Sequence, residues 1–141
     1  MSNSGFLRIS EASALALHTM YYLSTHTDGL VSTKEIASTF NISENHLAKV
    51  LQRLVKVRLV DSIRGPKGGF NLAKDSQKIT LLDIFEAIEG RAELDDCLLH
   101  QSVCGGGKEC VLFNGLIEEM NSQIQEHMKN KKLSDLKNLF N

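Results

Sequence analysis

The sequence predicts a mainly α-helical chain with a small β wing, in which a winged helix-turn-helix domain precedes a long C-terminal dimerisation helix. Residues 31–73 contain two short amphipathic segments of helical period, followed by two apolar strands around a glycine-rich turn. From Val111 to about Lys131, apolar side chains again recur at helical spacing. We divide the 141 residues into a winged-helix domain (1–90), a cysteine-bearing segment (91–110), and a dimerisation helix with its tail (111–141).

The first expected helix covers Glu11–Ser24, with Ser10 as its N-cap. Its core residues should be Leu15, Ala16, Met20 and Leu23. Met1–Ser10 has neither the basic region nor the apolar core of a signal peptide, and the apolar stretch Ala12–Leu23 is too short to span a bilayer. We therefore expect a cytoplasmic protein with no membrane partner.

The helix-turn-helix follows from local signals. Ser32 or Thr33 can cap a helix of about two turns that ends at Asn41, a residue that favours turns. Ser43 can cap a second helix that runs to Val57. The packed face of this second helix should hold Leu47, Val50, Leu51, Leu54 and Val57, and its outward face Asn45, His46, Lys49, Gln52, Arg53 and Lys56.

That outward face fits the major groove of DNA. Side-chain amides can read adenine, whereas cations can read guanine or bind phosphate. The alternative is an ordinary solvated charged face. We take Ser43, Asn45, His46, Lys49 and Arg53 as candidate DNA contacts.

The predicted wing decides between these interpretations. Leu59, Val60 and Ile63 form one apolar strand, and Phe70 with Leu72 forms another. Between them, Pro66 and three glycines favour a sharp turn with little side-chain bulk. Such a slim hairpin, with Arg64 and Lys67 as its cations, can enter a minor groove, where arginine meets an enhanced negative potential. Arg64 and Lys67 complete the candidate DNA contacts.

The charge distribution agrees with a nucleic-acid partner. Residues 43–78 contain eight Lys or Arg and three acidic residues, a net charge of +5. The whole chain has a formal charge of −1, so the remainder carries −6. A single basic block in a near-neutral chain is typical of a localised phosphate-binding surface. A membrane surface could attract the same block, but no amphipathic basic helix or lipidation signal accompanies it.

The next expected helix is Leu81–Gly90, with Thr80 as its cap, Leu82, Phe85 and Ile88 facing inward, and Gly90 as its stop. All three cysteines fall in the segment that follows this helix. Six residues separate Cys97 from Cys104, and five separate Cys104 from Cys110. Three consecutive glycines within this segment could let the backbone approach an inorganic cluster closely. Zinc is less favoured because the close Cys-x-x-Cys pairs of structural zinc sites are absent from the sequence, and a thiol redox switch remains a further alternative.

The C-terminal helix should present an apolar stripe formed by Phe113, Leu116, Ile117, Met120, Ile124 and Met128. A long amphipathic helix appended to a small domain favours a homodimer, although packing within the chain is the alternative. The tail Leu133–Asn141 could add a last turn.

The sequence resembles the IscR/NsrR-type winged-helix regulators. The matching segments are Leu7–Leu23, Ile42–Leu47, Gln52–Leu54, Leu59–Val60, Arg64–Phe70 and the cysteine segment. This resemblance implies a homodimeric transcription factor, and many members of the family carry an iron–sulfur cluster that senses iron, nitric oxide or redox state. Other members, such as the repressors of cysteine metabolism, carry no cluster.

The chain departs from the better-known members at the fourth cluster ligand. The histidine that assembly regulators place three residues after the last cysteine is Phe113 here, and the acidic residue that nitric-oxide sensors place on the first helix corresponds to Ala14. Glu11, one turn earlier, is our first candidate, while His18 and His100 are the alternatives. The choice between a [2Fe-2S] and a [4Fe-4S] cluster stays open with the ligand. Ala48 also replaces the acidic residue that discriminates between operators in the assembly regulators.

We therefore predict a non-enzymatic, homodimeric transcription regulator that binds a double-stranded DNA operator under the control of an iron–sulfur cluster held by Cys97, Cys104, Cys110 and Glu11. One alternative is a cluster-free winged-helix repressor that uses thiols or a partner as its signal. A small electron-transfer or redox protein is the third hypothesis, and the sequence offers no flavin or nucleotide motif in its favour.

Overall fold

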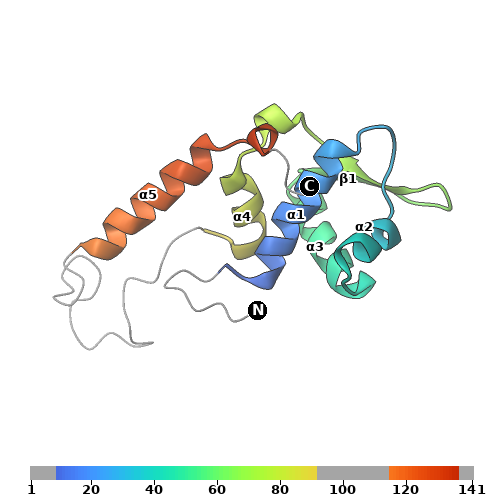
Figure 1. The fold of residues 1–141 in the computed structure, drawn as a ribbon, viewed down its shortest axis with the longest axis horizontal. Helices are drawn as coiled ribbons and strands as arrows, with labels where there is room; N and C mark the ends of the chain where they lie inside the picture. The colour runs from blue at the N-terminus through green and yellow to red at the C-terminus, as the bar shows by residue number, and fades with distance from the viewer. Residues whose placement is uncertain (1–8, 92–114, 137–141) are drawn as a thin grey trace.

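The structure is a computed structural model that describes residues 9–91 and 115–136, apart from the side chain of Ile117 (Figure 1). The fold class predicted from the sequence is confirmed: the described part is mainly helical and holds one small antiparallel sheet. Its elements in chain order are α1 (Glu11–Thr25), α2 (Thr33–Phe40), α3 (Glu44–Lys56), β1 (Val60–Ile63), β2 (Gly69–Leu72), η1 (Ser76–Lys78), α4 (Leu81–Glu89), α5 (Leu116–Asn130) and η3 (Leu133–Asp135).

The predicted caps define the helix-turn-helix. Ser32, rather than Thr33, is the N-cap of α2, because its side chain accepts a hydrogen bond from the backbone N–H of Glu35. Asn41 ends α2 in the left-handed conformation, with φ of 53° and ψ of 51°, which asparagine tolerates better than most residues. Ser43 then caps α3 by accepting from the N–H of His46. The predicted start of α2 and the predicted turn between α2 and α3 are therefore confirmed.

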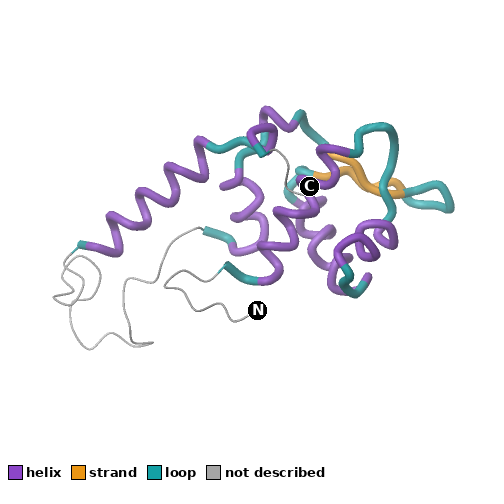
Figure 2. Tube along the Cα trace, in the orientation of Figure 1, coloured by secondary structure: helices purple, strands orange, loops and turns teal. Residues whose placement is uncertain are grey.

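Strands β1 and β2 form the wing, which Figure 2 shows as a hairpin extending away from the helices. They pair in antiparallel register, with Val60 opposite Leu72 and Ile63 opposite Gly69. Phe70 also pairs with Val31, which immediately precedes the cap of α2. The wing is therefore bonded to the start of the helix-turn-helix as well as to its own neighbouring strand.

The core lies where α1, α3 and α4 meet. It contains every core residue predicted for the first helix and the leucines of α3, and it is formed by Leu15, Ala16, Met20, Leu23, Ile36, Leu47, Leu51, Leu54, Ile79, Ile84 and Leu133, among others. Two predictions of inward-facing side chains were wrong. Val57 is 44% exposed because it is the C-cap of α3. In α4 the fully buried residue is Ile84. The predicted Leu82, Phe85 and Ile88 are half-buried, and of these three Ile88 packs against the core.

Helix α5 is joined to the domain at its C-terminal end. The N–H of Leu133 donates to the carbonyl of Ile79 over 2.8 Å, and the N–H of Leu81 donates to the carbonyl of Lys131 over 2.9 Å. From this junction α5 extends past α4 and away from the wing (Figure 1). The predicted start of this helix at Val111 lies outside the described residues. None of the described helices is long and apolar enough to cross a membrane.

Candidate nucleic-acid interface and sensing site

Helix α3 separates a buried leucine face from an exposed polar face. Leu47, Val50, Leu51 and Leu54 are at most 2% exposed. The opposite face carries the exposed side chains of Asn45, Lys49, Gln52, Arg53 and Lys56. Because the leucine face fixes the rotation of the helix about its axis, the polar face has one defined orientation. This arrangement is typical of a helix that enters a major groove.

The N-terminal turn of α3 holds two further candidates. The Ser43 Oγ accepts the capping hydrogen bond from the backbone N–H of His46 over 3.0 Å. The hydroxyl proton of Ser43 can still be donated to a second acceptor. The His46 side chain is half-buried, so it is less accessible than its neighbour Asn45. The helix N-terminus adds partial positive charge that favours an approaching phosphate.

Arg53 has a partner within the domain. Its Nη1 donates to the backbone carbonyl of Ile88, near the end of α4, over 3.1 Å. This carbonyl belongs to the last turn of the helix. Carbonyl groups there have no N–H donor within the helix, and they carry partial negative charge. This structural contact of the Arg53 side chain would compete with a contact to DNA.

The turn of the wing is set by its glycines. Gly65 has φ of +118°, and the N–H of Gly68 donates to its carbonyl over 2.9 Å. A Cβ at Gly68 would lie 2.1 Å from the carbonyl oxygen of Ile63, and one at Gly69 would lie 2.7 Å from that of Val31. These contacts are with backbone atoms, so a larger residue at either position would force the hairpin apart.

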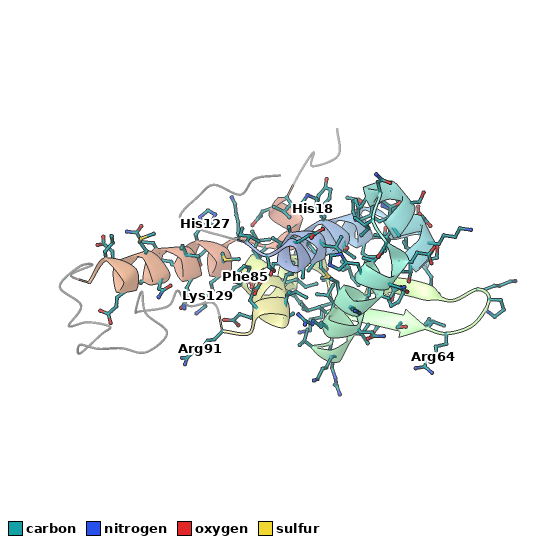
Figure 3. All side chains as sticks on the ribbon, turned by 90° about the horizontal axis from the view of Figure 1, so that it is seen from below. His18, Arg64, Phe85, Arg91, His127 and Lys129 are labelled. Atoms are coloured by element: carbon teal, nitrogen blue, oxygen red, sulfur yellow. The ribbon has the colours of Figure 1, made fainter. Side chains whose placement is uncertain are left out.

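Arg64 and Lys67 are both exposed on this turn. Figure 3 shows Arg64 on the hairpin, at the end of the molecule remote from α5. The wing therefore presents cations on a narrow backbone, as a finger that enters a minor groove requires.

The N-terminal end of α1 meets the C-terminal end of α4 at Glu89. The Glu89 carboxylate accepts from the Ser10 hydroxyl and, over 2.6 Å, from the Ser13 hydroxyl. Ser13 is fully buried, so this hydrogen bond satisfies a side chain that water does not reach. The bonds from Ser10 and Ser13, together with the nearby charge of Arg53, lower the pKa of Glu89 below its ordinary value.

Two of the three candidate fourth ligands, Glu11 and His18, lie on the outer side of α1. Glu11 is exposed in its first turn, and His18 is exposed two turns later, with its Nδ1 2.6 Å from the carbonyl oxygen of Ala14. Both line a shallow hollow of about 250 Å³ together with Ala14, Leu15, Phe40 and Ile42. His18 also makes an edge-to-face ring contact with Phe40. The described residues hold no cluster of three or more potential metal ligands.

Cys97, Cys104, Cys110 and His100 lie outside the described residues, so the cysteine segment itself stays a prediction. What the structure does describe is the last turn before it. Gly90 ends α4 with φ of +77° and ψ of −140°, and its N–H donates to the carbonyl of Glu86. The predicted stop at Gly90 is confirmed.

Sequence reasoning missed the contacts of Glu89 and Arg53. Both residues carry charge on helix faces expected to be exposed, and their partners are 76 to 79 and 35 positions away in the chain. A pattern over a few neighbouring residues cannot predict contacts between positions so far apart in the sequence. One hint is Ser13, which with Thr19 is a polar residue on the largely apolar inner face of the first helix.

The capped α2–α3 unit, the leucine-packed α3 and the hairpin bonded to Val31 define a winged helix-turn-helix protein of the class that regulates transcription. Comparison with known proteins agrees. The chain belongs to the Rrf2 family, described as iron-dependent transcriptional regulators, which it matches over residues 9–138. It is a transcriptional regulator and not an enzyme.

Among its relatives, an HTH-type transcriptional regulator of Aquifex aeolicus is 37% identical, with 92% of this chain and 91% of that protein covered. The transcriptional regulator NsrR of Halalkalibacterium halodurans is 31% identical, with coverage of 84% and 83%.

Two solved structures are similar over 92% of the chain. CymR, the global cysteine regulator of B. subtilis, has a TM-score of 0.74 and 30% identity, with 95% of its own chain covered. IscR of T. potens has a TM-score of 0.72 and 27% identity, with 85% covered.

Proposed function

We propose that this regulator binds an operator as a homodimer, with α3 in the major groove and the wing in the adjacent minor groove. The observation that carries this proposal is the exposed polar face of α3, held by buried leucines on one side and followed by a glycine-tight hairpin with two cations. Asn45 and Lys49 would read base edges or bind phosphate, Ser43 and His46 would bind near the helix N-terminus, and Arg64 and Lys67 would contact the minor groove.

We propose further that an iron–sulfur cluster, held by Cys97, Cys104 and Cys110, controls this binding. Thiolates are the preferred ligands of such clusters, and relatives named NsrR together with the family's iron-dependent description support the assignment. When bound, the cluster would supply sensitivity to iron, nitric oxide or redox state.

Glu11 suits the fourth ligand position better than His18. Glu89 bonds to Ser10, next to Glu11, and the cysteine-bearing segment leaves the domain immediately after Gly90. The chain thus enters that segment beside Glu11. His18 lies seven residues further along α1, about 10 Å away at 1.5 Å per residue. An exposed carboxylate is also a weak, exchangeable ligand for iron, as a sensor needs.

The homodimer is supported by α5. Apart from Ile117, whose side chain is not described, none of its side chains is buried within the chain, and Leu116 is 46% exposed while Met120, Ile124 and Met128 are half-buried. An apolar stripe left partly open on a helix that extends from the domain fits the interface of a symmetric dimer.

A cluster-free regulator is the second candidate. The similarity to CymR, whose printed role is the regulation of cysteine, favours it specifically. In that case the three cysteines would act as redox-sensitive thiols or would be inert, and a small molecule or protein partner would supply the signal.

One experiment separates the two candidates. The full chain is purified without oxygen, and its ultraviolet–visible spectrum is recorded alongside assays for iron and acid-labile sulfide. The cluster proposal expects a visible chromophore with equal iron and sulfide, which Cys97→Ser, Cys104→Ser and Cys110→Ser each abolish. A colourless protein with no iron would support the cluster-free candidate.

A further inference from the structure

A polar contact network joins three helices at one end of the domain. We call it the Glu89 latch and define it by the side chains of Ser10, Ser13, Arg53 and Glu89 with the backbone carbonyl of Ile88. The Glu89 carboxylate accepts from both serines of α1, and Arg53 of α3 donates to Ile88 one residue earlier in α4. The last turn of α4 is therefore held by α1 on one side and by the recognition helix on the other.

The electrostatics of the latch favour this arrangement at each contact. A carboxylate near the N-terminus of α1 meets the positive end of that helix dipole. A guanidinium near the C-terminus of α4 meets the negative end of the other dipole. The two charged side chains are also close enough for Arg53 to favour the ionised form of Glu89. Each contact is a charge-assisted hydrogen bond, the stronger kind in proteins.

The latch differs from the core in what it contributes. The side chains of Ser10, Arg53 and Glu89 are exposed, and only Ser13 is buried. Little apolar area is involved, so the latch adds little to the hydrophobic stability that the leucines provide. Directional hydrogen bonds between rigid helices instead fix their relative orientation.

We propose that Glu89 is a positioning residue for DNA recognition: through Ser10, Ser13 and Arg53 it sets the orientation of α3 relative to α1 and to the point where the chain leaves α4. A recognition helix must place its side chains accurately against base edges, whereas attraction to phosphates tolerates misplacement. Loss of the latch should therefore lower selectivity for the operator more than general affinity for DNA.

The position of the latch in the chain gives it a regulatory consequence, which rests on the proposed function. Glu89 is separated from the cysteine-bearing segment by Gly90 alone, and Ser10 adjoins the candidate ligand Glu11. A change at the cysteines that moves the end of α4 would reach α3 through Arg53. The latch would then couple the cysteine-bearing segment to the recognition helix.

The test uses the full chain and a duplex that the wild type selects from random sequence. The dissociation constants for this duplex and for a scrambled duplex are measured by fluorescence anisotropy at fixed salt, and their ratio is the selectivity. The variants are Glu89→Ala and Ser13→Ala. Glu86→Ala is the matched control, since Glu86 is an exposed acid of the same helix outside the latch. Thermal unfolding is followed for all of them.

We expect Glu89→Ala and Ser13→Ala each to reduce the selectivity about tenfold at temperatures where they are fully folded, and Glu86→Ala to leave it unchanged. Arg53→Gln should add little to Glu89→Ala in the double variant, because the proposal has Glu89 act on α3 through the hydrogen bond of Arg53 to the same turn of α4. Equal selectivity in Glu89→Ala and Glu86→Ala, or fully additive losses, would overturn the proposal.

The outcome is separable from that of the proposed function. Iron and sulfide assays on the same preparations report the cluster independently. If the wild-type chain contains no iron but Glu89→Ala still lowers the selectivity, the latch proposal is supported and the sensing proposal is overturned. If the wild-type chain contains a cluster but Glu89→Ala has the same selectivity as Glu86→Ala, the cluster assignment is supported and the latch proposal is overturned. A wild type that selects no duplex overturns both.

Discussion

Val31 and Phe70 exchange two backbone hydrogen bonds: the N–H of Phe70 donates to the Val31 carbonyl over 2.8 Å, and the N–H of Val31 donates to the Phe70 carbonyl over 3.0 Å. Val31 immediately precedes the cap of α2, so this pair joins the wing to the helix-turn-helix. The wing cannot change its angle to α2 without breaking both bonds. The two predicted DNA-contacting elements are consequently parts of one rigid unit.

Gly68→Ala should distort the wing. The added Cβ would meet the backbone carbonyl of Ile63 at 2.1 Å, a contact that only backbone movement can relieve. We expect operator affinity to fall about tenfold or more while the helical circular dichroism is retained, because the core lies elsewhere. Ser62→Ala, on an exposed position of β1, is the control. Wild-type affinity in Gly68→Ala would show that the wing does not contact DNA.

Arg64→Ala should weaken operator binding by about 1–3 kcal/mol, since an arginine in a minor groove is desolvated and directly contributes affinity. Lys74→Ala, an exposed cation beyond the end of β2, should have a smaller effect. Fluorescence anisotropy at several salt concentrations measures both.

Lys49→Ala should either reduce the salt dependence of binding by about one counterion, if Lys49 binds phosphate, or relax the base preference, if it reads a base edge. The two outcomes assign the role of the side chain. Unchanged affinity when Arg64 and Lys49 are substituted together would remove the proposed interface.

Polar substitution of the α5 stripe should dissociate the dimer. Met120→Glu combined with Ile124→Glu places charges in the proposed apolar interface, where they would be buried without partners. Ser122→Glu, on an exposed position of the same helix, should leave the dimer intact. Sedimentation velocity at micromolar concentration reports the assembly, and a wild type that sediments as a monomer would contradict the interface.

The contribution of Glu89 to stability should depend on pH. Its pKa is lowered from the ordinary value of 4.5 by the hydroxyls of Ser10 and Ser13, so folding favours the carboxylate. The stabilisation is therefore present above pH 4.5 and is lost as the pH falls through the lowered value in the folded chain. In urea titrations, Glu89→Gln should be less stable than wild type at pH 7, and the difference should narrow below pH 4. A difference that widens on acidification would contradict the assigned contacts.

Local signals accounted for most of the winged-helix fold. Ser10, Ser43 and Thr80 each cap a helix as predicted, because a cap depends on residues only three positions apart. The wing was predictable for the same reason, since its turn depends on a short run of glycine and proline. The pairing of Val31 with Phe70 spans 39 positions and has no sequence pattern.

The errors arose where helical period alone was used near an element's end. Val57 continues the apolar spacing of α3, but the helix stops at Lys56 and Arg58 takes up φ of 61°, which turns the chain away. The candidate DNA contacts were chosen by exposure and chemistry, and exposure alone did not distinguish Arg53, whose partner is on α4, from Lys49. Such a distinction requires tertiary structure.

If the state of the cluster controls operator affinity, the two properties must change together, so both are measured on one preparation. Protein purified without oxygen is divided, and half is stripped of iron with a chelator. Operator dissociation constants are then measured for both halves at the same salt concentration, with Cys104→Ser as a variant that has no cluster to lose. We expect the two wild-type halves to differ at least about tenfold and the two Cys104→Ser halves to agree. Equal operator affinity in the two wild-type halves would contradict control of DNA binding by the cluster, even if the first half contained a complete cluster.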